Sequence, residues 1–348
     1  MTDSMKKQKH VLSSGTVEMY FDAAFNQLTK LVDKKNAVIV TDENIFSKHR
    51  SKFKNWNVIT LKPGEQYKIQ LTADAIIEQL IEFQADRSTT LIGVGGGVIT
   101  DLTGYVASIF MRGIRFGFVP TTLLAMVDAS IGGKNGVDVG AYKNLVGSIR
   151  QPAFLLYDYG FLNTLPDMEW SNGFAEIIKH ACIFDARMFD ELKKHSLGRI
   201  KKEKKLLASI VEKNVALKLA VVKKDEFEKG DRKLLNFGHT LGHALETQYD
   251  LTHGQAVALG MVFAAWLSEK ILGLKKSSEI IQVLGQYKLP TFASFDTDRV
   301  FTILLMDKKR ISNTMHFILL DRIGKGVVHP MKINQLQKYV STYTQLNK

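Results

Sequence analysis

The sequence predicts an α/β fold in which a parallel-sheet domain is followed by a mainly α-helical domain. The chain has 348 residues, which is more than one hydrophobic core usually organises. Its first half alternates short strand patterns with helical patterns, as is typical of a parallel sheet covered by helices. After about Leu162 the pattern changes to long helical segments. We therefore expect a domain boundary near residue 160, giving domains 1–160 and 161–348.

Short runs rich in β-branched or aromatic residues predict the strands of the first domain. They are Asn36–Thr41, Asn57–Leu61, Thr89–Val94 and Phe116–Val119, with helices expected around Ile76–Ile81 and over Val98–Phe110. Helices of the second domain are predicted over Asp167–Ala181, Ser196–Val222, Arg232–Thr247, Gln255–Leu272 and Glu279–Leu289. A hairpin of Met315–Leu320 with Gly326–His329 and a helix over Asn334–Gln345 are expected to close the chain.

Composition argues against several classes of protein. Hydrophobic residues make up 45% of the chain and there are 6 prolines, so a largely disordered chain is not expected. The first residues contain no apolar segment and no run of 18 apolar residues occurs, so neither a signal peptide nor a membrane span is expected. The single cysteine, Cys182, cannot form an internal disulfide, which fits the cytoplasm, and it is expected to be a small core residue.

The net charge of +12 allows two interpretations, a nucleic-acid-binding protein or an enzyme with an anionic substrate. The basic residues are spread along the chain except at Lys201–Lys205, and such a run is typical of a solvated helix face. RNA-binding aromatic signatures and zinc-finger cysteines do not occur. We therefore expect an anionic small molecule as partner, and neither nucleic acid nor membrane.

Three histidines predict a divalent metal site. His239 and His243 are four residues apart in a helix-compatible run, so their imidazoles share one face, and His253 follows ten residues later. Spacing alone can be coincidence, but glycines at 238, 242 and 254 flank the histidines, as expected where something approaches the backbone closely. A catalytic metal site needs three protein ligands and an open position. By spacing, His239 and His243 would both be ligands.

Glu176 is the candidate carboxylate ligand. In a helix it shares a face with Lys179 and His180. A surface Glu–Lys pair is the alternative interpretation, but the apolar neighbours Phe174 and Ile177 place this helix in the interior. A carboxylate there is better explained by a metal.

Glycines at the end of the third predicted strand suggest a dinucleotide site. Gly95, Gly96 and Gly97 stand where the strand passes into a helix, and amides at a helix N-terminus favour anions. The spacing does not fit G-x-G-x-x-G, and glycine clusters also form ordinary tight turns. However, other strand ends carry polar residues at Asp42, Asn44, Glu65 and Lys68, and ligands of open α/β sheets bind beyond the carboxyl ends of strands.

The segment after the fourth strand suggests an anion site. Paired glycines precede Lys134, and Lys143 follows. A plain surface loop would explain one lysine, but both lysines together with Asp128, Arg112 and Asn144 favour a phosphate or carboxylate site.

Taken together, these residues resemble the 3-dehydroquinate synthase family of sugar phosphate cyclases over almost the whole chain. The shared motifs are Gly95-Gly-Gly-Val-Ile-Thr-Asp101, Met111-Arg-Gly113, Pro120-Thr-Thr-Leu-Leu-Ala-Met-Val-Asp128, Ile131-Gly-Gly-Lys134, Lys143-Asn144, Phe174-Ala-Glu-Ile-Ile-Lys-His180, Asp225-Glu-Phe-Glu228, Arg232-x3-Asn-Phe-Gly-His-Thr-x-Gly-His243 and His253-Gly-x-Ala-Val257. The resemblance implies a nucleotide-binding α/β domain followed by a helical metal-binding domain.

The resemblance also implies roles for single residues. It gives the metal to Glu176, His239 and His253 and makes His243 a substrate contact, in contrast to the spacing argument. It assigns NAD contacts to Asp42, Asn44, Glu65, Lys68, Gly96, Asp101, Thr121 and Thr122, with Lys134 and Lys143 added for the nucleotide's anionic groups. It assigns substrate contacts to Asp128, Lys134, Asn144, Lys179, Lys218, Arg232, Asn236 and His243, and a further phosphate contact to Lys308 or Lys309, of which we favour Lys308. Arg112 matches a residue that reaches the substrate phosphate from a neighbouring subunit, which implies a homodimer.

The activity that the resemblance implies is the second step of the shikimate pathway, in the biosynthesis of chorismate and aromatic amino acids. The family converts 3-deoxy-D-arabino-heptulosonate 7-phosphate into 3-dehydroquinate and phosphate, and its cofactors are NAD and a divalent ion, for which zinc is our first choice and cobalt also fits. Another sugar phosphate cyclase and a metal-dependent polyol dehydrogenase are the alternatives. The sequence departs from the family pattern at Thr100, Asn135, Gly140–Tyr142 and Arg150.

Overall fold

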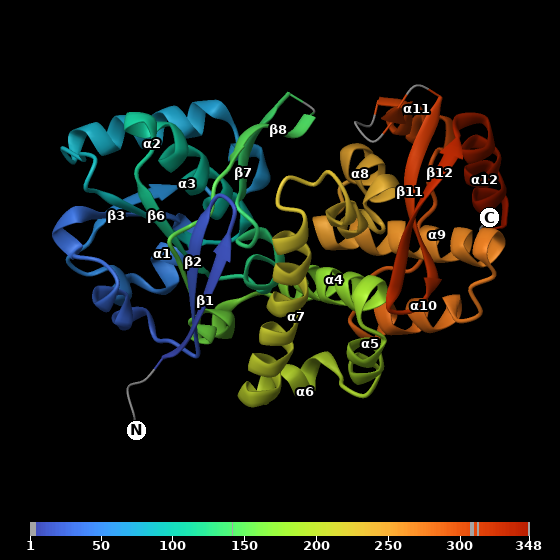
Figure 1. The fold of residues 1–348 in the computed structure, drawn as a ribbon, viewed down its shortest axis with the longest axis horizontal. Coiled ribbons are helices and arrows are strands. Elements are labelled where there is room, and N and C mark those ends of the chain that lie inside the picture. Colours follow the sequence, from blue (N-terminus) through green and yellow to red (C-terminus); the bar gives the residue numbers. More distant parts are fainter. Residues whose placement is uncertain (1–4, 141, 307–309, 312, 347–348) are drawn as a thin grey trace. The chain divides into compact units, whose positions relative to one another are not determined.

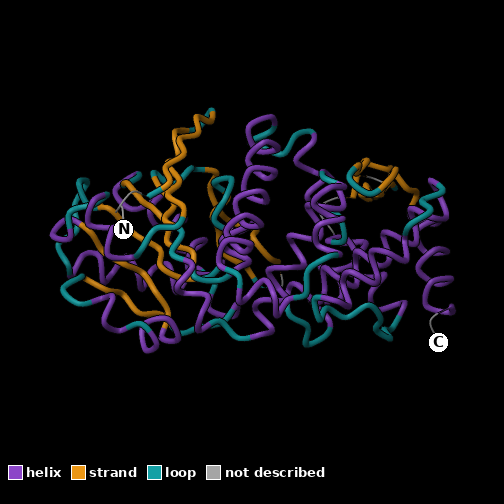
Figure 2. Tube along the Cα trace, turned by 90° about the horizontal axis from the view of Figure 1, so that it is seen from below, coloured by secondary structure: helices purple, strands orange, loops and turns teal. Residues whose placement is uncertain are grey.

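The computed structural model describes residues 5–140, 142–306, 310–311 and 313–346, which form two compact units. Unit 1 contains Met1–Trp170 and Ala208–Phe227, and unit 2 contains Ser171–Leu207 and Glu228–Lys348. Most of the strands belong to the first unit, and the second unit is mainly helical (Figure 2).

Unit 1 is built on a seven-stranded sheet (Figure 1). Its order is β1 (Lys6–Leu12), β2 (Gly15–Phe21), β9 (Phe154–Leu156), β6 (Arg115–Pro120), β5 (Thr90–Gly95), β3 (Ala37–Asp42) and β4 (Asn57–Leu61). The neighbours are parallel except for β1, which pairs antiparallel with β2 at one edge. Every residue of β5 is buried, as expected for an inner strand of a parallel sheet that is covered on both faces.

The helices of unit 1 follow the strands. They are α1 (Glu43–Lys48), α2 (Gln70–Glu82), α3 (Gly97–Ile109) and most of α7 (Lys204–Lys224), with single 3-10 or π turns between strands. The hairpin β7 (Lys134–Val139) and β8 (Tyr142–Ile149) packs against α3. Gly104 allows this packing, because a Cβ there would lie 1.9 Å from Oδ1 of Asn135. Apart from Ser148, the described residues of β8 are exposed.

The strand order reverses direction at one position in the sheet. Along the chain the sheet grows from β3 to β4 toward one edge, then from β5 to β6 and β9 in the other direction. The order therefore reverses between β3 and β5, whose carboxyl ends are Asp42 and Gly95. Such a reversal leaves a crevice beyond the strand ends, where ligands of open α/β sheets bind.

Unit 2 combines helices with a small antiparallel sheet of β10 (Arg310–Ile311), β11 (Thr314–Arg322) and β12 (Lys325–Lys332). Its helices are most of α4 (Asp167–Phe184), α5 (Ala186–Lys193), α6 (Leu197–Lys202), α8 (His239–Gln248), α9 (His253–Leu272), α10 (Ser277–Gln286), α11 (Thr297–Met306) and α12 (Ile333–Leu346). Side chains of α8, α9, α11, α12 and the sheet form its core, in which Phe263 is fully buried.

The predicted fold class is confirmed, with a parallel-sheet unit and a helical unit. The division of the chain differs from a single boundary at 160, because the chain returns from unit 2 to unit 1 over Ala208–Phe227. The reason is tertiary: Asn214 donates to the backbone oxygen of Val127 at 3.0 Å, and Lys218 contacts Asp128. A pattern read along the chain does not reveal such contacts.

Local differences also have local causes. The helix predicted over 196–222 is divided at Glu203 into α6 and α7. The helix predicted over 232–247 is interrupted at Gly238, whose φ of 79° is the left-handed conformation, so a 3-10 turn precedes α8. The segment expected to be an anion loop contains the β7–β8 hairpin.

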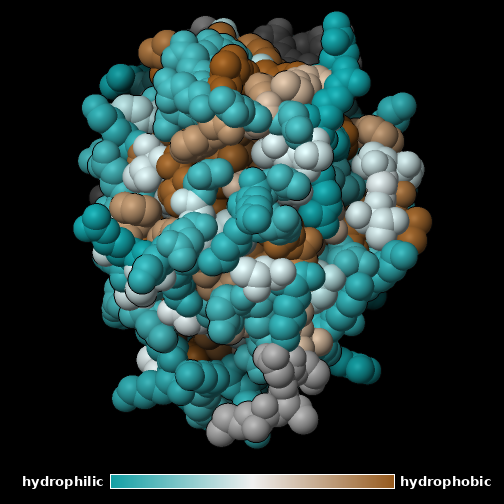
Figure 3. All heavy atoms as spheres, turned by 90° about the vertical axis from the view of Figure 1, so that its left-hand side faces the viewer, coloured by the Kyte–Doolittle hydropathy of each residue, from teal (hydrophilic) through white to brown (hydrophobic). Residues whose placement is uncertain are grey.

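One helix within the described residues, α9, is long and apolar enough by length and composition to cross a membrane. Of its most apolar window, 67% is buried within the protein. It is a core helix of unit 2, packed against α8, α10 and β11. The face seen in Figure 3, which carries unit 1, is covered mainly by hydrophilic side chains.

Candidate active site

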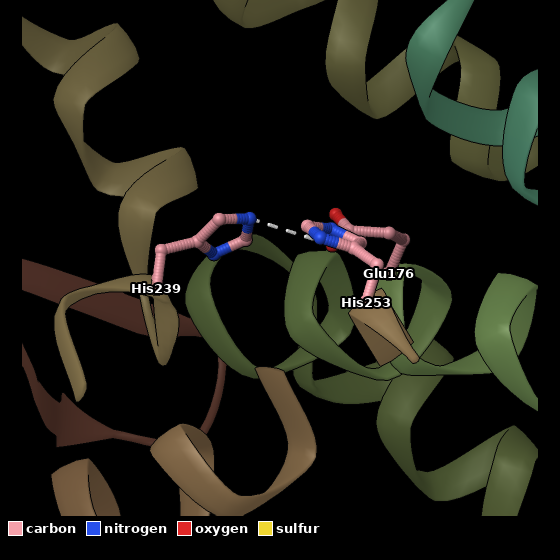
Figure 4. A group of neighbouring side chains, drawn as sticks. All are labelled: Glu176, His239 and His253. Atoms are coloured by element: carbon pink, nitrogen blue, oxygen red, sulfur yellow. Dashed lines mark ion pairs between the residues drawn. The ribbon is translucent and has the colours of Figure 1, made fainter. Parts of the chain in front are cut away.

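Glu176, His239 and His253 come together in unit 2. They belong to α4, α8 and α9, and their side chains point toward one another (Figure 4). Oε1 of Glu176 lies 3.6 Å from Nε2 of His239 and 3.4 Å from Nε2 of His253. One ligand atom from each residue lies within 4.8 Å of the other two. The consecutive helices α8 and α9 and the distant helix α4 therefore present two imidazole nitrogens and one carboxylate oxygen to a common point.

These distances fit a single metal ion. Ligand atoms bound at about 2.1 Å to a tetrahedral ion lie roughly 3.4 Å from each other. The two oxygen–nitrogen distances of 3.4 and 3.6 Å are close to that separation. Two imidazoles and one carboxylate, with a fourth position left open, form a donor set that suits catalytic zinc. The residues present thus fit a divalent ion.

The start of α9 is fixed by α4, one turn before Glu176. Thr252 caps α9 by accepting from the backbone N–H of Gln255, and its hydroxyl donates to Oδ1 of Asn172 at 2.6 Å. Gly254 lies directly against Asn172, because a Cβ at Gly254 would be 2.5 Å from the Cα of Asn172. Asn172 and Glu176 are four residues apart on α4 and so share one face. The same face of α4 therefore holds the helix that carries His253 and supplies the carboxylate facing it.

His239 is the first residue of α8, and a backbone oxygen beside its ring favours one tautomer. Its Nδ1 lies 3.2 Å from the backbone oxygen of Phe237, which accepts a hydrogen bond when Nδ1 carries the proton. That leaves the lone pair of Nε2 for a metal. Burial, and next the positive charge of Lys179, hold the pKa of His239 well below its ordinary value. The neutral form of imidazole that binds metals is thus favoured.

The two carboxylate oxygens of Glu176 face different charged or ionisable groups. Oε1 faces the two histidines, while Oε2 contacts the ammonium group of Lys179 one turn along α4. The Glu176 side chain is fully buried and that of Lys179 nearly so. Burial disfavours the charged form of His253, but contacts with Glu176 and Glu246 outweigh it and raise the pKa of this imidazole to about 9. One carboxylate oxygen is therefore directed to the candidate metal position and the other to a cation.

His243 lies one turn after His239 on α8, with the two ring centroids 5.1 Å apart. Its ligand atom does not fall within the group formed by Glu176, His239 and His253. It belongs instead to a second group with Glu246 and His253. The shared helical face that the spacing predicts is present, but the histidine that joins His239 at the candidate metal position is His253.

The other predicted residues of unit 2 lie before α8 or outside the described residues. Arg232 is buried in the 3-10 turn Asp231–Asn236. Asn236 ends that turn and donates to Oε1 of Glu228 at 2.8 Å. Lys308 and Lys309 lie outside the described residues. The sequence pattern assigns no role to Glu228 and Glu246, although Glu228 ends the motif Asp225–Glu228 and Glu246 lies three residues after His243.

In unit 1 the predicted nucleotide residues gather at the carboxyl ends of the strands. Asp42 ends β3 and caps α1 by accepting from the N–H of Ile45 at 3.0 Å. Asn44 lies within α1, and Gly96 precedes α3 directly after β5. Thr121 and Thr122 follow β6, where the hydroxyl of Thr122 accepts from the N–H of Ala125. A Cβ at Gly96 would lie 3.1 Å from the Thr122 side chain, so the ends of β5 and β6 are close neighbours.

Lys68 links the nucleotide and substrate candidates of unit 1. Its buried ammonium group lies 2.6 Å from Oδ2 of Asp101 on α3 and 3.7 Å from Oε1 of Glu65. It also donates to Oδ1 of Asn144 on β8 at 2.6 Å. Burial lowers the pKa of Lys68, but the charges of Asp101 and Glu65 outweigh burial and raise it. Lys68 therefore remains a cation that holds β8 close to α3.

A second pair joins α7 to the segment after β6. Lys218 donates to Oδ1 and to the backbone oxygen of Asp128, both at 2.6 Å. The two remaining lysines lie on the hairpin, Lys134 at the start of β7 and Lys143 on β8, and both are exposed. Arg112 lies in the turn after α3 with φ of 65°, beside the exposed side chains of Ile109 and Met111.

Comparison with known proteins gives the family. Residues 58–172 match the N-terminal domain of 3-dehydroquinate synthase, and residues 173–310 match its C-terminal domain. A protein of Campylobacter concisus (strain 13826) named 3-dehydroquinate synthase is 43% identical over 316 residues, which cover 87% of this chain and 90% of that protein. The chain belongs to the 3-dehydroquinate synthase family.

Solved structures of other cyclases share the fold. The 2-epi-5-epi-valiolone synthase from Streptomyces hygroscopicus subsp. jinggangensis 5008, with NAD+ and Zn2+ bound, superposes with a TM-score of 0.86 at 24% identity, covering 99% of this chain and 100% of that one. A 2-deoxy-scyllo-inosose synthase complexed with carbaglucose-6-phosphate, NAD+ and Co2+ gives 0.85 at 24% identity, covering 97% and 99%.

Three departures from the usual 3-dehydroquinate synthase pattern have structural explanations within unit 1. The hydroxyl of Thr100 donates to the backbone oxygen of Gly97 at 3.0 Å and stays inside α3. Asn135 donates to the backbone oxygens of Gly133 and Arg150, which ties the two ends of the hairpin together. Arg150 donates to the backbone oxygen of Ala107 at 2.8 Å, and its guanidinium group lies over the ring of Phe116. Each substituted side chain is therefore used for packing or for backbone hydrogen bonds.

Proposed function

We propose that this protein is a 3-dehydroquinate synthase, which converts 3-deoxy-D-arabino-heptulosonate 7-phosphate into 3-dehydroquinate and phosphate in the shikimate pathway. It would be a carbon–oxygen lyase acting on phosphates. The observation that carries the proposal is the convergence of Glu176, His239 and His253 in a chain 43% identical to a protein of that name. A fold shared with other cyclases supports the same class of reaction.

The proposed metal ligands are Glu176, His239 and His253, and zinc or cobalt fits this donor set. A divalent ion bound there would act as a Lewis acid toward the substrate hydroxyls. Phe237 and Lys179 support this site: the Phe237 carbonyl directs Nε2 of His239 inward, and Lys179 holds the second oxygen of Glu176. The chain's own residues thus fix the direction of the ligand atoms before an ion enters.

The proposed NAD contacts lie at the carboxyl ends of β3, β5 and β6 in unit 1. The strand order reverses between β3 and β5, which is where a dinucleotide binds in open α/β sheets. Asp42, Asn44, Glu65, Lys68, Gly96, Asp101, Thr121, Thr122, Lys134 and Lys143 are the residues we propose for it. NAD would supply a hydride acceptor for the C5 hydroxyl of the substrate and return the hydride later, so that no NADH accumulates.

The proposed substrate contacts are mainly cations and amides. They are Asp128, Lys134, Asn144, Lys179, Lys218, Arg232, Asn236, His243 and Lys308. Cationic groups suit a substrate that carries both a carboxylate and a phosphate. Lysine, arginine and asparagine outnumber the obvious acid–base groups Asp128 and His243 in this set, so we infer that the protein acts mainly by orienting the substrate and by stabilising charge.

We also propose a cytoplasmic homodimer in which Arg112 reaches the active site of the neighbouring subunit. Exposed apolar side chains of unit 1 include Ile109 and Met111, which neighbour Arg112 in the sequence, and Leu145, Val146 and Ile149 on β8. The hydroxyl of Ser148 on β8 lies 2.8 Å from that of Ser108, which places this strand next to the end of α3. An apolar surface around a positioned arginine is typical of a protein interface.

The decisive experiment is an assay of the purified protein with the heptulosonate phosphate, a divalent ion and a catalytic amount of NAD. We expect stoichiometric release of phosphate, a product with the spectrum of 3-dehydroquinate and no continuous formation of NADH. Turnover of a different sugar phosphate would favour another cyclase. Continuous formation of NADH from a simple polyol without phosphate release would instead identify a polyol dehydrogenase.

A further inference from the structure

We infer that Glu246 is a positioning residue for the metal centre, acting through His253. The inference rests on the proposed ligand set of Glu176, His239 and His253. Nε2 of His253 faces Oε1 of Glu176 at 3.4 Å, so its other ring nitrogen points away from the ion position. That nitrogen, Nδ1, lies 3.5 Å from Oε2 of Glu246.

The position of Glu246 on α8 and its burial both favour a role at the candidate metal site. It lies seven residues after His239 and three after His243, so the three side chains share one face of the helix. The Glu246 side chain is 8% exposed, and a carboxylate that is so deeply buried needs a partner that justifies its desolvation. One helix therefore carries a metal ligand at its start and, two turns later, the carboxylate that faces the ligand of the next helix.

The two histidine ligands are then supported in the same way. The backbone oxygen of Phe237 faces Nδ1 of His239, and Glu246 faces Nδ1 of His253. In each case an acceptor on Nδ1 fixes the tautomer and the ring orientation in which Nε2 binds metal. Support by a carboxylate also makes the imidazole a stronger donor, and loss of such support typically lowers metal affinity about 10- to 100-fold.

A different role for Glu246 is geometrically available and must be tested against this one. His243, Glu246 and His253 place ligand atoms within 4.8 Å of one another, so these residues form a second candidate metal group. In that arrangement Glu246 would itself be a ligand, and Nδ1 of His253 would bind a second ion. The two roles differ in the number of ions that each chain binds. They also differ in whether a glutamine at position 246 can preserve metal affinity in place of the carboxylate.

The test is a titration of the metal-free full chain with Zn2+ in competition with a chromophoric chelator, for the wild type, Glu246→Gln and Glu246→Ala. Glu269→Gln is the matched control, because Glu269 is an acidic residue of unit 2 that is exposed on α9 and pairs with Lys270 and Ser277. We expect one ion per wild-type chain and a 10- to 100-fold loss of affinity in Glu246→Ala, in the range typical of such supporting groups. Glu246→Gln keeps an oxygen that accepts from Nδ1–H, so it should lose less, and the control should match the wild type.

Circular dichroism and melting of the metal-free forms check that the variants fold alike, and the visible spectrum of the Co2+ forms reports the ligand geometry independently of activity. Equal affinities in the wild type and Glu246→Ala would overturn the inference, as would equal losses in the Ala and Gln variants. Two ions per wild-type chain, one of them lost with Glu246, would make Glu246 a ligand instead. A wild-type chain that binds no ion would contradict the proposed metal site as well, whereas a failure confined to the variants leaves that site standing.

Discussion

Gly260 of α9 lies directly against the backbone oxygen of Gly238, the residue before α8. A Cβ added at Gly260 would be 1.8 Å from that oxygen, which no side chain tolerates without movement of the helices. Gly238 in turn has a left-handed backbone and faces Met261 of α9, while Gly242 faces Ala256. The glycines around the histidines therefore serve the close packing of α8 on α9, the two helices that carry His239 and His253.

Gly260→Ala should for this reason destabilise unit 2 and weaken metal binding together. A methyl group in this contact would push α8 and α9 apart, and such overpacking typically costs about 1–3 kcal/mol. Gly285→Ala is the control, since a Cβ there meets no atom within 4 Å and α10 should gain up to roughly 1 kcal/mol. Melting temperature and bound zinc are measured for both variants. If Gly260→Ala melted and bound zinc like the wild type, the close contact would not limit the packing.

The ligand set predicts opposite results for two histidines of the same region. His253→Ala should lose both bound metal and turnover, because it removes one of three ligands. His243→Ala should keep most of the metal and still lose turnover, because it removes only a proposed substrate contact. Elemental analysis of the folded variants measures the metal directly. Metal lost from His243→Ala and retained in His253→Ala would contradict the ligand set and restore the pairing that spacing suggests.

The sequence predicted the four strands β3 to β6 and most of the long helices, because these depend on local hydrophobic periodicity, but it did not reveal β1, β2 and β9 of the same sheet. Spacing alone does not single out His253 as the partner of His239, because helical periodicity tells which side chains share a face but not which side chains of another helix they meet. His253 is placed beside His239 by the packing of α8 on α9 and by Asn172, which seats the start of α9 on α4. Glu246 and the return of α7 to unit 1 depend on tertiary contacts of the same kind.

The hydrogen bonds of Glu226 predict that the free energy of unfolding falls in acid, independently of the active site. Its carboxylate follows α7 and accepts hydrogen bonds from the hydroxyls of Ser13 and Ser14 in the β1–β2 turn and from Gln151 at 2.8 Å. Burial favours the neutral acid, but these hydrogen bonds outweigh it and lower the pKa of Glu226 to about 2. The ordinary pKa of a glutamate is 4.5, so the charged form is favoured by folding.

A group whose pKa is lowered by folding stabilises the protein above its unfolded pKa, and this contribution disappears as the pH falls toward the folded value. Glu226 should therefore contribute on the order of 2 kcal/mol at neutral pH, all of which is lost between about pH 4.5 and pH 2. The melting temperature of Glu226→Gln should lie below that of the wild type at pH 7, and the two should converge as the pH is lowered through this range. A difference that stays constant with pH would show that the charge of Glu226 is not the source of the stability.

Arg112 provides a test of the proposed dimer that uses two inactive proteins. If Arg112 acts in the neighbouring active site, Arg112→Ala and His253→Ala should each be nearly inactive alone. In a mixed dimer the chain with Arg112→Ala keeps its own metal ligands and receives the intact arginine of its partner, so one of the two sites is complete. Random exchange of subunits makes half of the dimers mixed, and the mixture should recover about a quarter of the wild-type activity, since a symmetric dimer contributes its residues reciprocally.

Mixing Arg112→Ala with a chain that carries both Arg112→Ala and His253→Ala is the control, because neither chain can supply the arginine, and light scattering measures the oligomeric state throughout. Recovery must follow the time course of subunit exchange and must be absent when two chains with Arg112→Ala are mixed. A monomeric protein, or a mixture that remains as inactive as its components, would place Arg112 outside the neighbouring site. Because Arg112 lies among exposed apolar side chains at the end of α3, we expect exchange to be slow and the recovered activity to persist after dilution.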